Sequence, residues 1–188
     1  MDDQTKSVPQ EPQKKDTAWE LHSWLRDIVF CVTLVTLVFV FAVRLVNVDG
    51  DSMYPTLHNF DKVALRSGVL CEPEVGDIVV LRAPGYQMPL VKRVIATEGQ
   101  TVDIDFVAGI VYVDGVALEE PYVNSPTNAM GDTQFPQTVA EGCVFVLGDN
   151  RNDSSDSRHA RVGQVPKEKI LGEVMLVLWP LDRFGGAE

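Results

Sequence analysis

The chain has 188 residues, enough for one domain with a small extension, and 45% of them are hydrophobic, so a packed core can form. Its formal net charge of -11 argues against a nucleic-acid partner, because such partners require a basic surface. The three cysteines show neither a C-x-x-C pair nor any metal-ligand spacing, so we expect no metal site. Cys31 lies in the most apolar stretch, and whether Cys71 and Cys143 pair in a disulfide is left open.

The first part of the chain has two different compositions. Residues 1–16 are polar, contain prolines and charges of both signs, and show no hydrophobic period, which is typical of a disordered tail. Residues 28–43 form an uncharged apolar run, IVFCVTLVTLVFVFAV. A bilayer core of about 30 Å needs about 20 helical residues, and the apolar residues 45–48 bring the run to that length. We therefore predict a juxtamembrane and transmembrane helix over residues 17–48.

A buried core helix and a cleavable signal sequence are the alternatives for this segment. The run has no polar face, which disfavours an amphipathic soluble helix, and no small-x-small cleavage site follows it. Trp19 and Trp24 would lie at the membrane interface. A slight excess of Lys and Arg before the run favours a cytoplasmic N-terminus and an extracytoplasmic remainder.

Residues 49–188 read as β-structure. Short apolar runs are separated by Gly and Pro, and Asp114-Gly115 between two such runs is a strong hairpin signal. No convincing helical period appears after residue 50. The sequence predicts a mainly β domain, an antiparallel sheet or barrel-like fold, with strands at 78–81, 90–96, 110–113, 116–118, 144–147 and 174–179.

A Gly- and Pro-bounded loop, VDGDSMYPTL, directly follows the predicted membrane helix. Most serines in such loops are ordinary turn residues. However, Gly50 permits unusual backbone angles beside Ser52, and a fixed loop with free backbone N–H groups suits a nucleophile that needs an oxyanion site. His58 and His159 are weak candidates for its base, because both lie in polar loop stretches.

Lys92 is a better candidate for a base. In LVKRVIA, strand alternation places Leu90, Lys92, Val94 and Ala96 on one face. A lysine among apolar neighbours loses solvation, so its pKa falls toward neutrality and it can act as a general base. A lysine at an exposed strand edge would look the same if the segment stood alone.

A third segment, GDNRNDSSDSR at residues 148–158, is a dense polar turn after a predicted strand. It does not fit a calcium EF-hand loop, which needs its acidic ligand at the twelfth position and flanking helices. In the order GDSMYPTL, VKRVIA and GDNRNDSSDSR after a membrane helix, the chain resembles the bacterial type I signal peptidases. The resemblance runs from about Thr17 to the C-terminus.

The resemblance implies a serine endopeptidase with Ser52 as nucleophile and Lys92 as general base, without metal or organic cofactor. It further implies that Ser154 orients the lysine and that Met53 contacts the substrate. Structural support would come from Asp149 and from an ion pair between Asp156 and Arg158. Some members carry a serine two positions before the nucleophile; Gly50 stands there, so the oxyanion hole would rest on backbone N–H groups, first that of Ser52.

The implied substrates are secretory preproteins, cut after small-x-small signal-peptide sites at the bilayer surface; which preproteins are preferred is left open. The chain departs from the family's usual RVIGLPGD at Ala96, Glu98 and Gln100, which puts only local geometry in doubt. A self-cleaving repressor-type Ser-Lys peptidase would carry a DNA-binding or cytosolic N-terminal portion, whereas this chain has the predicted membrane helix there. An inactive membrane-tethered binding domain would have no need for Ser52, Lys92 and Ser154 together.

Overall fold

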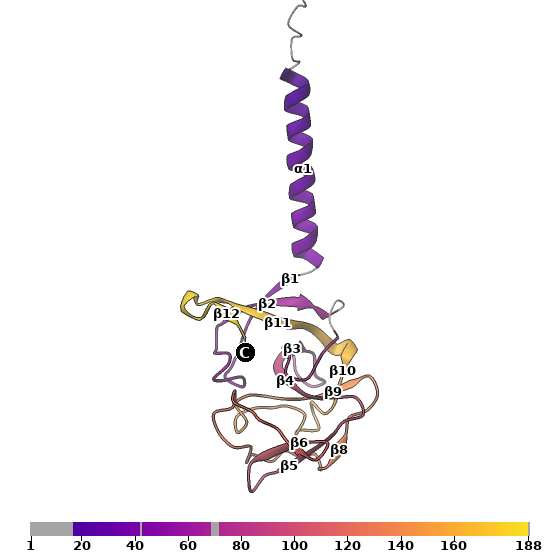
Figure 1. Ribbon diagram of the computed structural model, residues 1–188, viewed down its shortest axis with the longest axis vertical. Helices are drawn as coiled ribbons and strands as arrows, with labels where there is room; N and C mark the ends of the chain where they lie inside the picture. The colour runs from indigo at the N-terminus through magenta and orange to yellow at the C-terminus, as the bar shows by residue number, and fades with distance from the viewer. Residues whose placement is uncertain (1–16, 42, 69–71, 188) are drawn as a thin grey trace, which may run out of the picture. The chain divides into compact units, whose positions relative to one another are not determined.

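The computed structural model describes residues 17–41, 43–68 and 72–187. The predicted tail, residues 1–16, and Cys71 lie outside the described residues, whereas Cys143 has a free thiol. The chain divides into two compact units, residues 1–38 and 39–188. The α-helix α1 (Thr17–Phe41) begins in the first unit and ends just past its boundary, and it coincides with most of the predicted helix (Figure 1). Within the part of the chain that the structure describes, no helix combines the length and the apolar character needed to cross a membrane.

The predicted end of the helix at Val48 is wrong. Residues Val43–Asn47 form strand β1, which pairs with β2 (Lys62–Ser67) along its whole length. Val46 packs against a buried cluster and Val48 is 3% exposed, so these two residues belong to the core of the second unit. An apolar run has no period that distinguishes a buried strand from the continuation of a helix.

The second unit consists of two antiparallel sheets, which confirms the prediction of a mainly β domain. In the larger sheet the order is β1-β2-β11-β3-β4-β9-β10, with β12 added to β11. The smaller sheet has the strand order β7-β6-β5-β8, and Figure 1 shows β5, β6 and β8 close together. The remaining strands and 3₁₀ helices are β3 (Ile78–Leu81), β4 (Leu90–Thr97), β5 (Thr101–Asp105), β6 (Ile110–Val113), β7 (Val116–Ala117), β8 (Gln137–Thr138), β9 (Cys143–Leu147), β10 (Val165–Pro166), η2 (Lys167–Lys169), β11 (Ile170–Trp179), η3 (Leu181–Arg183) and β12 (Gly185–Gly186).

All six predicted strands are present, and so is the predicted hairpin. Asp114 and Gly115 have φ of 51° and 78°, and Val113 pairs with Val116. Two consecutive residues with positive φ match the twist of the flanking strands, which is why Asp-Gly occurs here. The prediction missed β1, β2 and β5, and the two-residue strands β8, β10 and β12.

Strand β4 lies inside the larger sheet, with β3 on one side and β9 on the other. Five consecutive residues of β4, from Lys92 to Ala96, are buried, so both faces of the strand are covered. The register shifts between Val94 and Ala96, and these two side chains join different buried clusters. The expectation that Ala96 shares a face with Lys92 and Val94 is therefore wrong, because the irregularity breaks the two-residue alternation.

Candidate active site

The loop of residues 48–61, here called the Ser52 loop, connects β1 to β2. Hydrogen bonds close its base: the Val48 N–H donates to the Asp61 carbonyl (2.8 Å) and the Phe60 N–H to the Val48 carbonyl (2.9 Å). Gly50 has φ of +93°, a conformation that side chains other than glycine rarely adopt. The loop thus begins and ends on the sheet and presents Ser52 between two fixed points.

Lys92 on β4 meets Ser52 directly. The distance from Lys92 Nζ to Ser52 Oγ is 2.6 Å, and the same Nζ lies 2.8 Å from the Val91 carbonyl oxygen. Lys92 is 2% exposed. Burial lowers the pKa of Lys92 from 10.5 to about 8, although the carboxylates of Asp156 and Asp149 act to raise it. A lysine with this pKa is substantially neutral under mildly alkaline conditions and can accept a proton from the serine hydroxyl.

Beside this pair lies a cavity of about 150 Å³. Its walls are mostly apolar and come from β1 and the start of the Ser52 loop, from β3, and from the end of the 82–89 loop with the start of β4. Ser52 and Lys92 open into it. The lining residues are Val46, Asn47, Val48, Asp49, Ser52, Val80, Met88, Pro89, Leu90, Val91 and Lys92. A cavity of this size suits small apolar side chains next to the hydroxyl.

The backbone around Ser52 offers a free donor. Across the described residues the Ser52 N–H makes no hydrogen bond, while the Ser52 carbonyl accepts one from the Asn150 N–H at 3.1 Å. The Gly50 N–H is occupied, because it donates to Asn59 Oδ1 at 3.1 Å. A free N–H on a held peptide is the arrangement that stabilises a developing oxyanion. This geometry favours Ser52 over Gly50 as the donor.

Asp149 anchors the Ser52 loop to β4. Its carboxylate accepts two hydrogen bonds from Arg93, from Nε at 2.9 Å and from Nη2 at 2.7 Å. It also accepts one from the Thr56 hydroxyl at 2.5 Å. Arg93 and Asp149 are both buried, so the pair is shielded from solvent and its geometry holds Thr56 in place.

Asp156 and Arg158 form a second buried ion pair. Arg158 donates to the two carboxylate oxygens of Asp156 through Nε and Nη2, each at 2.8 Å, and the Gly148 N–H donates to Oδ2 at 3.0 Å. Burial by itself would raise the pKa of Asp156, but the Arg158 guanidinium and the Gly148 N–H bring it below its usual value. The pair thus fixes the polar turn that follows β9.

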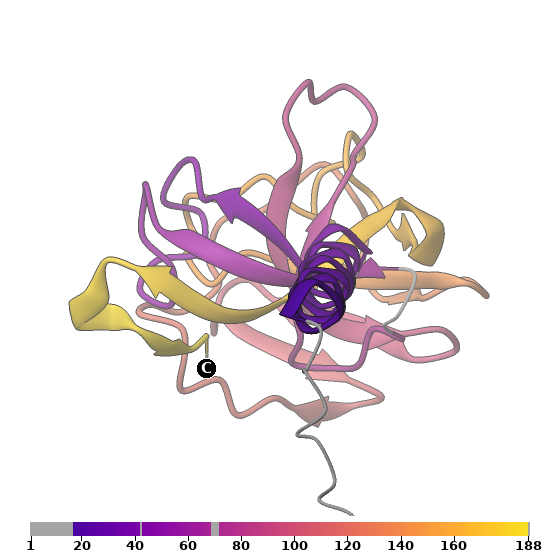
Figure 2. The ribbon, with the colours of Figure 1, turned by 90° about the horizontal axis from the view of Figure 1, so that it is seen from above.

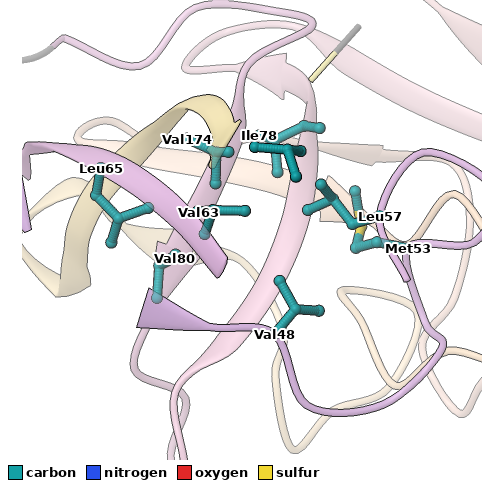
Figure 3. Close-up of a cluster of buried hydrophobic side chains, with 9 residues drawn as sticks. Val48, Met53, Leu57, Val63, Leu65, Ile78, Val80 and Val174 are labelled. Atoms are coloured by element: carbon teal, nitrogen blue, oxygen red, sulfur yellow. The ribbon is translucent and has the colours of Figure 1, made fainter. Parts of the chain in front are cut away.

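Two predicted site residues lie differently from the expectation. Ser154 Oγ is buried without a hydrogen-bond partner in the described residues, and no hydrogen bond joins it to Lys92. Met53 is 1% exposed and packs with Leu57 and Ile78 in a buried cluster (Figure 3). Met53 therefore packs the Ser52 loop against the core, and it does not line the cavity.

Sequence reasoning assigned no role to several residues that brace the site. Arg151, fully buried, donates to both carboxylate oxygens of Glu120 (2.7 and 2.6 Å) and to the Gly148 carbonyl (3.0 Å). Arg93 lies 4.0 Å from the centre of the Tyr122 ring. Burial raises the pKa of Tyr122 to about 12, and Glu120 contributes to that shift. Arg93 in VKRVIA and Arg151 in GDNRNDSSDSR were the signal in the sequence that could have indicated these contacts. A charged residue within a strand or beside an acidic turn needs an oppositely charged or hydrogen-bonding partner.

No group of three or more His, Cys, Asp or Glu side chains is placed to hold a metal ion in the described ranges. The contacts described above bring together a serine, a buried lysine, a free backbone donor and two buried ion pairs. Its chemistry is that of a hydroxyl nucleophile with a lysine base.

The chain is similar to several known proteins. A sequence model described as "Signal peptidase, peptidase S26" matches residues 21–179. Signal peptidase I of Bacillus amyloliquefaciens is 34% identical over 178 residues, which are 89% of each chain. Signal peptidase I S of Bacillus subtilis is 36% identical over 171 residues, 85% of this chain and 89% of the relative. A crystal structure of a signal peptidase I from Enterococcus faecalis V583 is 31% identical, has a TM-score of 0.47, and covers 55% of this chain and 97% of its own.

The chain belongs to the signal peptidase family, peptidase S26. It is a serine endopeptidase.

Proposed function

We propose that this protein removes N-terminal signal peptides from secreted preproteins, with Ser52 as nucleophile and Lys92 as general base. The observation that carries the proposal is the 2.6 Å contact between Lys92 Nζ and Ser52 Oγ, made by a lysine whose pKa is lowered to about 8. The names of the relatives support the substrate class. The small apolar cavity beside Ser52 supports cleavage after small-x-small sites, because small apolar side chains would fit in it.

The proposed reaction begins with neutral Lys92, which takes the Ser52 proton as the hydroxyl oxygen attacks the scissile carbonyl. The free Ser52 N–H stabilises the oxyanion. Lys92 then gives its proton to the leaving amine, and the new N-terminus departs. Lys92 finally activates a water molecule, which hydrolyses the ester and frees Ser52. Neither a metal nor an organic cofactor takes part in these steps.

The proposal extends to a membrane location. Residues 28–43, an uncharged apolar run, belong largely to α1, and apolar side chains of that helix such as Phe30 are exposed, Phe30 to 67%. Exposed apolar surface of this kind favours contact with lipid. We propose a single membrane span within α1, residues 17–41, a cytoplasmic N-terminal tail and an extracytoplasmic peptidase unit, with the signal peptide and the bilayer as partners and no nucleic acid.

The dyad is tested by separate replacement of its two members. We expect Ser52→Ala and Lys92→Ala each to reduce preprotein cleavage in detergent to background, because one removes the nucleophile and the other its base. Ser155→Ala and Lys62→Ala alter an exposed serine and an exposed lysine and serve as matched controls. Turnover above a tenth of the parent rate in either dyad variant would contradict the assignment.

A further inference from the structure

The residues that follow β11, near the C-terminus, lie close to the end of the Ser52 loop. After β11 the chain makes the short helix η3, and β12 then pairs back on β11 at Leu176 and Val177. Figure 2 shows β11 and β12 in yellow, side by side and ending near the C-terminus. β11 also pairs with β2, where Trp179 is opposite Lys62, the residue that follows the Ser52 loop. The C-terminal hairpin, residues 179–186, therefore lies beside the end of that loop.

Arg183 of this hairpin holds the Ser52 loop at two points. Its Nη1 lies 3.0 Å from Asp61 Oδ1 and 2.9 Å from Asp61 Oδ2, and its Nη2 donates to the Thr56 carbonyl at 3.0 Å. The Asp61 side chain is only 2% exposed, and its carboxylate also accepts the His58 N–H at 2.7 Å. Arg183 is the one cation paired with this buried carboxylate among the described residues.

Further hydrogen bonds connect Thr56, one of the two residues that Arg183 contacts, with the backbone of Ser52. Thr56, whose carbonyl Arg183 holds, donates its hydroxyl to Asp149. The next residue, Asn150, donates its N–H to the Ser52 carbonyl and its side-chain amide to the Asp51 carbonyl. The Ser52 loop is thus fixed from one side by Arg183 and from the other by Asp149 and Asn150.

Loss of Arg183 would leave a buried carboxylate without its cation, a costly state. Asp61 could escape this cost by turning toward water, which would loosen the loop. A displacement of about 1 Å between reacting groups can reduce a rate on the order of 100-fold. The 2.6 Å contact between Ser52 and Lys92 would be sensitive to such a displacement. Arg183 also lies beyond residues 21–179, the part of the chain that the family's sequence model matches.

We propose that Arg183 is a positioning residue, and that through Asp61 and Thr56 it sets the place of Ser52 against Lys92. This role rests on the proposed function, because it presumes Ser52 as the nucleophile. It predicts a loss in kcat with little change in KM, since Arg183 does not line the cavity beside Ser52.

The experiment compares Arg183→Ala, Arg183→Lys and Asp182→Ala in the full-length chain with a signal-peptide substrate. Asp182→Ala changes an exposed neighbour in the same short helix and is the control. We expect kcat of Arg183→Ala to fall on the order of 10- to 100-fold, with KM within about twofold. Arg183→Lys should keep part of the activity, because lysine restores the charge but not the forked contact. Each rate is measured well below the melting temperature of that variant, so that all of the enzyme is folded.

Two further measurements separate positioning from stability. Methylguanidinium added to Arg183→Ala should restore part of kcat, while the same concentration of tetramethylammonium should not. In an Asp61→Asn background the same change at Arg183 should cost much less, because no buried charge is left without a partner. An unchanged kcat in Arg183→Ala, or a lowered melting temperature with neither rescue nor coupling, would overturn the positioning role. If Ser52→Ala cleaved as fast as the parent chain, the proposed function itself would fail, independently of these results.

Discussion

Lys92 occupies an environment that disfavours its charged form. Burial has the largest effect and lowers the pKa of Lys92 to about 8; Asp156 and Asp149 oppose the shift and Arg158 adds to it. The base must be neutral to accept the Ser52 proton, so the active fraction is small below this pKa and complete above it. The carboxylates of Asp156 and Asp149 keep the pKa of Lys92 from falling further. Because both belong to buried ion pairs, these pairs help to set the pH range in which Lys92 can act as a base.

A pH profile tests this directly. We expect kcat/KM to rise about tenfold per pH unit below pH 8 and to level off above it, because this ratio reports the free enzyme. The peptide substrate should carry no group that titrates between pH 5 and 9. Circular dichroism at each pH, with recovery of activity after return to pH 8.5, checks that the fold persists. A profile that is flat or falls from pH 6 to pH 8 would rule out Lys92 as the titrating base.

At the scale of single residues, the sequence alone indicated Ser52 as a candidate nucleophile and Lys92 as a candidate base. It indicated only some of the residues that hold these two in place. Lys92 stood out because a charged residue among apolar neighbours on a strand has few explanations. The roles of Met53 and Ser154 came only from the family pattern, and the structure places Met53 in the core and leaves Ser154 Oγ without a partner. Asp61 and Arg183 gave no signal, since their contact joins residues 122 positions apart.

At the scale of elements, the turn after β9 must lie very close to the Ser52 loop. A Cβ added at Gly148 would be 2.2 Å from Ser154 Oγ and 2.5 Å from the Ser52 carbonyl oxygen. Both distances are far below contact, and the second atom is backbone, so one of the two segments would have to move. Glycine is needed here because the segments approach closely, and a left-handed backbone is not the reason.

Gly148→Ala is therefore expected to separate the two segments. Displacement of Ser52 from Lys92 should lower kcat/KM on the order of 100-fold. Gly99→Ala is the control: Gly99 has φ of +83° with open space around it, so alanine there adds backbone strain without a collision. Peptide cleavage and melting temperature are compared for both variants. Activity within twofold of the parent for Gly148→Ala would show that the close approach does not matter to the site.

The element pattern was predictable where it is local. Each predicted strand was a short, mostly apolar segment with turn residues near its ends, and Asp114-Gly115 is a residue pair typical of hairpin turns. Strand β2, KVALRS, and strand β5, TVDID, were missed because charged residues shorten their apolar pattern. Strand β1 was assigned to the helix, because its apolar residues continue the run of α1 with only Arg44 between them.

At the scale of the whole molecule, the proposed membrane span makes a distinct prediction. Each aspartate at the centre of a spanning helix costs about 2.5–3.5 kcal/mol of insertion free energy. Val32→Asp together with Val35→Asp should therefore move the full-length protein from the alkali-resistant membrane fraction to the soluble fraction. Ser23→Asp, near the start of α1, adds a similar charge away from the centre and should leave the distribution unchanged. If the double variant stayed in the membrane fraction, this helix would not be the anchor.

The sequence by itself determined six of the strands, the hairpin turn and the ordered motifs that place the chain in its family, because these depend on residues close together in the chain. The tertiary structure decided which of those residues meet. Ser52 and Lys92 are 40 positions apart, and their 2.6 Å contact depends on the closed base of the Ser52 loop and on the burial of β4. The lowered pKa of Lys92 and the hold of Arg183 on Asp61 arise in the same way, because burial and long-range pairing exist only once the sheet has formed.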